Sequence, residues 1–592
     1  MCGIAGIIAP DGLARGAFAP LDAVSRALRH RGPDSEGSWI DTHVALSHRR
    51  LVVVDPSPAG AQPMCSDDHL AAIAYNGELY NDADIRASLG GPFRSACDTE
   101  TVLAALRRWG PDALPRLRGM YAFAFVDLTE RTLLLARDPL GIKPLYYAIT
   151  PAGDVVFASE VAAVLEHPAV TRDPDPVTLR AYISTIRTTL GARTLYRDIR
   201  TLLPGEWMLF NLDAPRSPAR RGITPLPAPE PGTTKAVIAQ SVRLHLRSDV
   251  PMCSLLSGGL DSTIIARETL RSVPTLRTYC SGAADAASSE IDDFAAARVA
   301  SRQLGTEHHE APVSRELFLE RWREMVTRSR LPMSTPNEVA INEVARTLRS
   351  QGNIVALSGE GADELFGGYD LLLEASHALH ASGRVSRRDA AASELANASW
   401  VPGDALAGVL AEPYVEAEGG ADATLDAYDA EFARVGYDEE PDKVLSHLRV
   451  QRRINLAGLL ARLDSATMLA GVEGRTPFAD ARVAAFAEAL PMHEKFIAGP
   501  PGQSPRERAA RTKRCLRSAY AEEIPREVLE RPKASFPLPF QSWLASPDVV
   551  EPALRSRFAC EIMNPAMVEA LRANPAALWR VLWPTLNLSL WF

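Results

Sequence analysis

The stretch MCSLLSGGLDSTIIARETLR, residues 252–271, decides the architecture of the larger part of this chain. A short apolar run leads into a Ser-Gly-Gly turn, and apolar residues at helical spacing follow the turn. A glycine turn between a strand and a helix lets backbone N–H groups approach a polyanion, to which the helix N-terminus also presents its positive dipole end. The stretch therefore predicts a buried strand, a phosphate-binding turn and a helix, as in a parallel α/β sheet.

The residues of this turn suit nucleotide phosphates, although the Walker pattern GxxxxGK[ST] is absent. Asp261 would repel a phosphate directly, so we expect it to act through a bridging magnesium ion. An ordinary glycine turn before a capped helix is the alternative for SGG alone, and the whole string after a buried strand disfavours it. The predicted phosphate contacts from the turn itself are Ser257, Gly258, Gly259 and Ser262.

A second string, LSGEGADELFGGYD (357–370), follows the apolar run NIVAL. Glu360, Asp363 and Glu364 stand in it among small residues, and such carboxylates repel one another unless a metal or a cation is near. Because ligands bind outside the carboxyl ends of parallel strands, we expect Asp261 and Asp363 to hold one Mg²⁺ between them. A solvated acidic loop is the alternative, which four glycines and two aromatic residues in the string disfavour.

Composition bounds the class of protein. The 592 residues suggest two to four domains. A net charge of −9 argues against nucleic acid as a partner, and no apolar run is long enough for a membrane span. Seven cysteines without regular CxxC pairs form no disulfide framework, which predicts a reducing, cytoplasmic location.

The pattern of elements changes at a proline-dense stretch, residues 211–234. Before it, short strands and a few helices predict an α+β domain, with a helix at 98–110 and a tight Asn-Gly turn in YNGELY (75–80). After it, strands and helices alternate, and from about residue 370 the pattern is mainly helical. Segment 401–441 is expected to be a surface excursion. The predicted strands lie within 44–55, 69–81, 120–138, 154–160, 252–259, 276–282, 307–313 and 353–360.

The chain begins MCGIAGIIAP, which leaves two interpretations for Cys2. It is either a buried strand residue or a nucleophile that is exposed when Met1 is removed. Nine motifs in order now bear on the choice, and together they resemble the glutamine-dependent asparagine synthetase family. They are MCGIAG (1–6), HRGPD (30–34), HRRL (48–51), YNGE (75–78), RDPLGIKPLYY (137–147), SGGLDS (257–262), LSGEGADELFGGY (357–369), GVEGRTPF (471–478) and RPKASFPLPF (531–540).

The resemblance implies two domains and a linker. Residues 2–210 would form a glutaminase domain of the N-terminal nucleophile type, an αββα sandwich. Residues 211–234 would be a Pro-rich linker, and residues 235–592 an α/β parallel-sheet ATP-pyrophosphatase domain with a helical C-terminal part. The resemblance also implies a homodimer.

In the first domain the resemblance makes Cys2 the nucleophile, with its own α-amine as the base once Met1 is gone. Attack on the glutamine side-chain amide would give a thioester and ammonia. Asn76 and Gly77 would stabilise the oxyanion. The other glutamine contacts implied are Arg50 for the carboxylate, and Glu78 and Asp98 for the α-ammonium region.

In the second domain the resemblance implies that Glu360 serves formation of the acyl-adenylate and the attack of ammonia on it. Lys513 would neutralise phosphate charge in the transition state. A tunnel would carry neutral ammonia between the two sites. The implied ATP contacts are Leu255, Ser281, Ser358 and Gly359, beside those of the turn, and the implied cofactors are ATP as substrate and Mg²⁺.

The acceptor end departs from the family. SRLPMSTPNEVAINEVAR (329–346) lacks the Arg-containing string expected to hold an aspartate α-carboxylate, and has Asn337 and Glu338 instead. Three hypotheses remain. The first is an asparagine synthetase that uses aspartate, glutamine and ATP. The second is an amidotransferase of the same mechanism for another carboxylic acid, a secondary metabolite or a carrier-tethered acid. The third is a non-catalytic or purely ligating relative, such as a cyclase that forms an intramolecular amide without glutamine. Such a relative can dispense with Cys2, and the presence of Cys2, Arg50, Asn76, Gly77 and Asp98 disfavours it.

Overall fold

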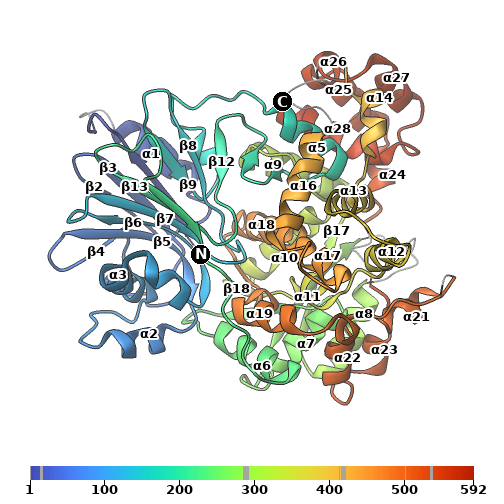
Figure 1. Cartoon of the computed structure of the whole chain (residues 1–592), viewed down its shortest axis with the longest axis horizontal. Coiled ribbons are helices and arrows are strands. Elements are labelled where there is room, and N and C mark those ends of the chain that lie inside the picture. Colours follow the sequence, from blue (N-terminus) through green and yellow to red (C-terminus); the bar gives the residue numbers. More distant parts are fainter. Residues whose placement is uncertain are drawn as a thin grey trace.

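The structure is a computed structural model that describes residues 2–13, 18–284, 293–411, 414, 422–500, 502–533 and 538–592. Met1, the middle of the RPKASFPLPF motif and part of segment 401–441 lie outside these residues. Figure 1 shows two halves: stacked sheets in blue to teal on one side, and many helices around a smaller sheet on the other. The N-terminus lies where the two halves meet.

Two antiparallel sheets form the N-terminal half. The eight-stranded sheet has the order β10-β11-β12-β8-β9-β1-β3-β2, and the six-stranded sheet has the order β14-β13-β7-β6-β5-β4. The strands are β1 (Gly3–Ile8), β2 (Ser35–Ile40), β3 (Val44–Arg50), β4 (Met64–Cys65), β5 (Ala71–Leu79), β6 (Gly119–Asp127), β7 (Thr132–Arg137), β8 (Tyr146–Ile149), β9 (Val155–Ala158), β10 (Thr189–Leu190), β11 (Arg193–Thr194), β12 (Ile199–Thr201), β13 (Glu206–Asn211) and β14 (Arg220–Ile223).

The two sheets pack face to face and helices cover their outer faces. Apolar residues of both sheets share one core, to which Ile4, Leu46, Ala124 and Met208 belong. Helix α3 (Asp98–Trp109) packs with the six-stranded sheet, and α1 (Phe18–Ala27) and α4 (Val161–Val164) pack with the eight-stranded one. The layers therefore run helix, sheet, sheet, helix. The predicted helix at 98–110 is confirmed, with Gly110 as its C-cap.

The predicted turn at Asn76-Gly77 is wrong. Strand β5 runs straight through both residues, which pair with Ala122 and Tyr121 of β6. The Asn-Gly signal is local, and nine consecutive pairs with β6 override it. The glycine is needed for another reason, since a Cβ at Gly77 would lie 2.3 Å from the carbonyl oxygen of Met120.

Part of the predicted linker is a strand. β14 lies inside residues 211–234 and pairs with β13 at the edge of the six-stranded sheet. Its position at an edge accommodates the neighbouring prolines, which cannot donate to a sheet ladder. The chain then enters the second half at α6 (Thr234–His245).

A five-stranded parallel sheet organises the second half, in the order β17-β16-β15-β18-β19. Its strands are β15 (Met252–Leu255), β16 (Arg277–Ala283), β17 (Glu307–Val313), β18 (Val355–Leu357) and β19 (Glu473–Arg475). All recorded pairs are parallel, which confirms the predicted α/β sheet. Because β15 pairs with β18, the loops at their carboxyl ends meet.

Helices make up most of the remaining chain. They are α2 (Asp82–Leu89), α5 (Pro176–Thr185), α7 (Leu260–Thr269), α8 (Asp293–Leu304), α9 (Arg315–Ser329), α10 (Asn337–Ser350), α11 (Ala362–Phe366), α12 (Asp370–Ala381), α13 (Arg387–Ala398), α14 (Leu406–Val409), α16 (Asp422–Arg434), α17 (Lys443–Gln451), α18 (Ala457–Met468), α19 (Ala481–Ala489), α20 (Met492–Lys495), α21 (Pro505–Ala509), α22 (Arg514–Ala519), α23 (Arg526–Leu529), α24 (Phe540–Leu544), α25 (Pro547–Leu554), α26 (Arg557–Glu561), α27 (Pro565–Ala573) and α28 (Trp579–Trp591). Within the described residues, no helix combines the length and the apolar character needed to cross a bilayer.

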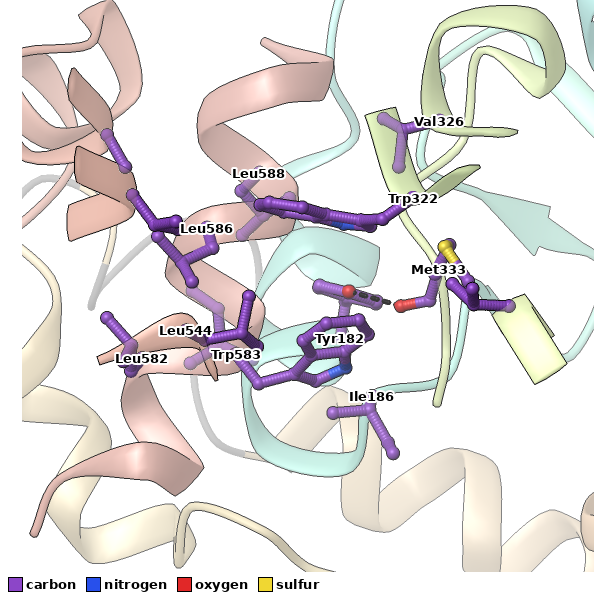
Figure 2. Packing of buried hydrophobic residues seen from close by; sticks show 14 of the residues in the cluster. Tyr182, Ile186, Trp322, Val326, Met333, Leu544, Leu582, Trp583, Leu586 and Leu588 are labelled. Atoms are coloured by element: carbon purple, nitrogen blue, oxygen red, sulfur yellow. Dashed lines mark hydrogen bonds between the residues drawn. The ribbon is translucent and has the colours of Figure 1, made fainter. Parts of the chain in front are cut away.

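The last helix, α28, is built into the largest apolar core. Figure 2 shows Trp583 of α28 beside Tyr182 of α5, with a hydrogen bond from the Tyr182 hydroxyl to the carbonyl of Met333. That bond measures 2.6 Å. Trp583 donates its indole N–H to the carbonyl of Ser334 at 3.0 Å. Helix α5 of the N-terminal half and the last helix, α28, therefore fix the loop that precedes α10.

Candidate active sites

Cys2 directly precedes β1 and is 8 % exposed. Its backbone N–H donates to Oδ1 of Asn76 at 2.9 Å, and its Sγ lies 3.9 Å from the carbonyl oxygen of Leu51. Burial raises the pKa of the thiol. Two residues that the sequence placed in one site therefore touch, although 74 positions separate them.

Asn76 keeps an unused donor beside this thiol. Its side chain is fully buried, and within the described residues its Nδ2 has no hydrogen-bond acceptor. A buried amide donor without an acceptor is uncommon and points to a missing ligand. The position suits a group that carries negative charge next to Sγ during reaction.

The other predicted glutamine contacts lie nearby, and each is engaged with the protein. Arg50 donates to the carbonyls of Val54, Asp55 and Ser57. The carboxylate of Asp98, on the first turn of α3, accepts the N–H of Leu79 at 2.7 Å. Burial raises the pKa of Asp98. Their role toward glutamine stays a prediction.

Glu78 faces the second half of the molecule. Its carboxylate lies 3.3 Å from Arg247 Nη1 and 3.4 Å from Arg475 Nη2. Burial raises its pKa well above the usual value, and the nearby charge of Asp98 adds to the effect. The predicted glutamine-binding residue is thus also part of the contact between the two halves.

Sequence reasoning missed Arg31, which connects Cys2 to the second half. The side chain is fully buried, and Nε donates to the carbonyl of Cys2 at 3.2 Å. The Nη atoms pair with Glu160 and Asp464 at 2.9 Å each. The HRGPD motif contains this residue, and that motif was the only signal for it.

The loop at residues 257–262, predicted to bind phosphate, has the predicted strand–turn–helix form. Gly259 caps α7, and Ser257 Oγ and Ser262 Oγ lie 3.2 Å apart. Gly258 has a positive φ of 70°, and a Cβ there would lie 2.4 Å from the carbonyl carbon of Ala296. Position 258 therefore requires glycine, because its backbone angle is left-handed and because no space is left for a Cβ atom.

Gly258→Ala is expected to destabilise the protein and abolish ATP use. The left-handed φ and the contact with Ala296 together should lower the free energy of unfolding by about 2–4 kcal/mol. Gly352→Ala is the matched control, because Gly352 has φ of 85° with no atom within 4 Å of an added Cβ. Thermal unfolding and ATP–pyrophosphate exchange measure both variants. Equal shifts in melting temperature would contradict the tight contact at Gly258.

Asp261 and Asp363 do meet, with lysine between them. Lys513 Nζ lies 2.6 Å from Asp261 and 2.7 Å from Asp363, and Lys533 Nζ lies 2.7 Å from the other oxygen of Asp363. Although burial alone would lower it, the two carboxylates raise the pKa of Lys513 to about 12. Lys533 was not predicted, although it stands in the quoted RPKASFPLPF motif.

The donor set is compatible with magnesium near nucleotide phosphates. Asp261 Oδ1 is buried and has no hydrogen-bond partner in the described part of the chain. Those residues contain no group of three or more His, Cys, Asp or Glu side chains able to hold a metal alone. A magnesium ion here would therefore need phosphate oxygens as ligands in addition to these carboxylates.

Glu360 follows β18 and is held by Arg462 of α18, whose Nη2 lies 2.9 Å from the carboxylate. Leu255, Ser358 and Gly359 lie beside it in the cavity described next. Ser281 lies at the end of β16, and its hydroxyl donates to the carbonyl of Ala311 at 2.8 Å. The hydroxyl is therefore engaged with the protein, and a backbone contact from Ser281 to ATP stays a prediction.

One cavity of about 820 Å³ joins these groups. Its lining includes Ser257, Asp261 and Glu360 at one end and reaches Arg31, which bonds to Cys2. Helix α16, in the segment expected to be a surface excursion, contributes Tyr428 to the wall. That segment is therefore partly a wall of the site.

A two-sheet domain with Cys2 directly before its first strand, followed by a parallel-sheet domain with a Ser-Gly-Gly loop, is typical of the class of two-domain amidotransferases. A family model described as "Glutamine amidotransferase domain" matches residues 1–218, and one described as "Asparagine synthase" matches residues 233–592. The chain belongs to the asparagine synthase family.

Curated relatives agree with this assignment. A putative asparagine synthetase [glutamine-hydrolyzing] of Mycobacterium tuberculosis is 32 % identical over 100 % of this chain and 97 % of its own length. Asparagine synthetase [glutamine-hydrolyzing] 1 of Bacillus subtilis is 29 % identical over 92 % and 88 %. Asparagine synthetase B of Escherichia coli is 32 % identical over 58 % and 60 %.

Proposed function

We propose that this protein is a carbon–nitrogen ligase that takes nitrogen from glutamine and transfers it to aspartate, with ATP converted to AMP and pyrophosphate. The product is asparagine. The observation that carries the proposal is that two sites are connected. Cys2 lies beside Asn76, whose Nδ2 has no acceptor in the described residues, and the cavity that contains the proposed phosphate-binding loop reaches Arg31, which bonds to Cys2. Residues 2–210 and 235–592 are the proposed domains, the first of the N-terminal nucleophile type.

In the first domain, the Cys2 α-amine takes the thiol proton once Met1 has been removed. Sγ then attacks the glutamine amide carbon, and the oxyanion receives hydrogen bonds from Asn76 and the backbone of Gly77. Ammonia leaves as the thioester forms, and water releases glutamate. Arg50, Glu78 and Asp98 are the proposed contacts for the amino acid end of glutamine.

In the second domain, a carboxylate oxygen of aspartate attacks the α-phosphorus of ATP and pyrophosphate leaves. Lys513 stabilises the negative charge that develops on the phosphates. Glu360 accepts a proton as ammonia attacks the acyl carbon and AMP leaves. Magnesium, when bound near Asp261 and Asp363, screens the charge of the phosphates.

Ammonia must pass between the domains in its neutral form, because ammonium is no nucleophile. Supporting this route, Arg31 bonds to the carbonyl of Cys2 and also lines the cavity that contains Glu360. A route enclosed by protein keeps ammonia unprotonated and excludes competing water.

The decisive test is ATP–pyrophosphate exchange with a panel of carboxylic acids. We expect aspartate to support exchange well above the rate without acid, and glutamine or ammonia then to give asparagine and AMP in equal amounts. If aspartate gave no exchange while another acid did, the acceptor in this proposal would be wrong. If none of the acids supported exchange, the proposed ATP chemistry would be wrong as well.

A further inference from the structure

Arg462 lines the cavity and contacts Glu360. It belongs to α18, which continues from α17 through η5 (Arg452–Leu456), a π-helical segment of the kind often found at functional sites. Nη2 contacts Glu360, and Nη1 donates to Thr335 Oγ1 at 3.1 Å. The side chain is 10 % exposed, and Arg462 is part of the cavity lining.

The guanidinium has donors to spare. Of its five N–H groups, two have acceptors within the described residues, and Nε is buried without one. A planar fork of donors matches a carboxylate better than any other anion of that size. Arg462 can therefore bind an incoming carboxylate while it holds Glu360.

The charged groups around these donors have partners of their own, although Arg462 lies near enough for its charge to act on the Glu338 carboxylate. Glu338 directs its carboxylate to the backbone N–H groups of Ser334 and Thr335, at 2.7 and 3.1 Å. Lys513 and Lys533 are paired with the carboxylates of Asp261 and Asp363. Lys533 also lines the cavity, but it is paired with Asp363 and lies over the ring of Tyr369, whereas Arg462 has donors unused within the described residues and contacts Glu360 itself.

The partner that fixes Arg462 is itself rigid. Thr335 ends the loop that Tyr182 and Trp583 hold through the carbonyls of Met333 and Ser334, as Figure 2 shows for Tyr182. Asn587 of α28 also accepts the N–H of Met333 at 3.1 Å. A donor held on both sides loses little entropy on binding, which favours specific recognition.

Building on the proposed function, we infer that Arg462 binds a second carboxylate of the acceptor and that the site selects dicarboxylic acids. The first carboxylate reacts at ATP beside Glu360, and the second is held by the free N–H groups of Arg462. The arginine expected in residues 329–346 is thereby replaced by one on a different helix.

The test compares aspartate with β-alanine, which is aspartate without the second carboxylate, using ATP–pyrophosphate exchange. In the unmodified enzyme we expect kcat/KM for aspartate to exceed that for β-alanine by about 10²-fold or more. In Arg462→Gln the ratio should fall below about 5-fold, through the KM of aspartate rather than that of ATP. Arg462→Lys should restore part of it. If Arg462 only held Glu360, the substitution would lower kcat/KM for both acids equally and leave their ratio unchanged.

Arg434→Gln is the matched control, because Arg434 lines the same cavity and pairs with Glu431. Its ratio should equal that of the unmodified enzyme. Glutamine hydrolysis by each variant reports that the fold is intact. If the unmodified enzyme used another dicarboxylic acid, the aspartate proposal would fail while this inference stood. If it preferred a monocarboxylic acid, or if the ratio survived in Arg462→Gln, the inference would be overturned.

Discussion

Cys2→Ala is expected to reduce glutamine-dependent product formation by at least about 10³-fold and to leave ammonia-dependent formation near the unmodified rate. The thiol forms the covalent intermediate in the proposed mechanism, and alanine cannot. The phosphate-binding loop and Glu360 lie in the other half of the molecule, so they should be undisturbed. Product formation with glutamine and with ammonium salts measures the two routes separately.

Cys65→Ala is the control for this experiment. Cys65 lies in the same half, on β4, and is also a free thiol that is largely covered. It should keep both activities. Glutamine-dependent turnover that persisted in Cys2→Ala would remove the nucleophile assignment. The intact mass of the unmodified protein should lack Met1, because an acylated α-amine cannot act as the base.

Local signals predicted the loops that carry the chemistry. The SGGLDST turn depends on residues within a few positions of one another, so its strand, its glycine turn and the helix that follows could be predicted directly. The same kind of reasoning failed at Asn76-Gly77. There the preference for a turn was overridden by pairing with β6, which no local pattern contains.

Contacts between distant parts of the chain explain what was missed. Arg31 pairs with Asp464, 433 positions away, and Arg462 pairs with Glu360 across 102 positions. Each of these arginines considered alone would be taken for a surface residue, since arginine is seldom buried without a partner. Glu338 is the opposite case. Its position in the sequence suggested a contact with the acceptor, but its carboxylate accepts a hydrogen bond from Ser334 of the adjoining loop.

Lys513→Met is expected to reduce turnover by about 10³-fold with glutamine and with ammonia alike, and to remove ATP–pyrophosphate exchange. Lys513 stands between the carboxylates of Asp261 and Asp363, with a pKa raised to about 12 by these two groups although burial opposes the rise. Methionine keeps the stem and removes the charge. The carboxylates would then repel each other and the phosphates of ATP.

Glutamine hydrolysis separates this loss from unfolding. Because Cys2 and Asn76 lie in the other domain, Lys513→Met should still convert glutamine to glutamate. Lys235→Met is the control, since Lys235 pairs with Glu523 away from the loops and should keep full turnover. Lys513→Arg retains the charge with a different shape, so it should retain more exchange than Lys513→Met. Equal exchange in Lys513→Met and the unmodified enzyme would show that this lysine neutralises the aspartates alone, and the phosphate charge would then be left to Lys533 and to magnesium.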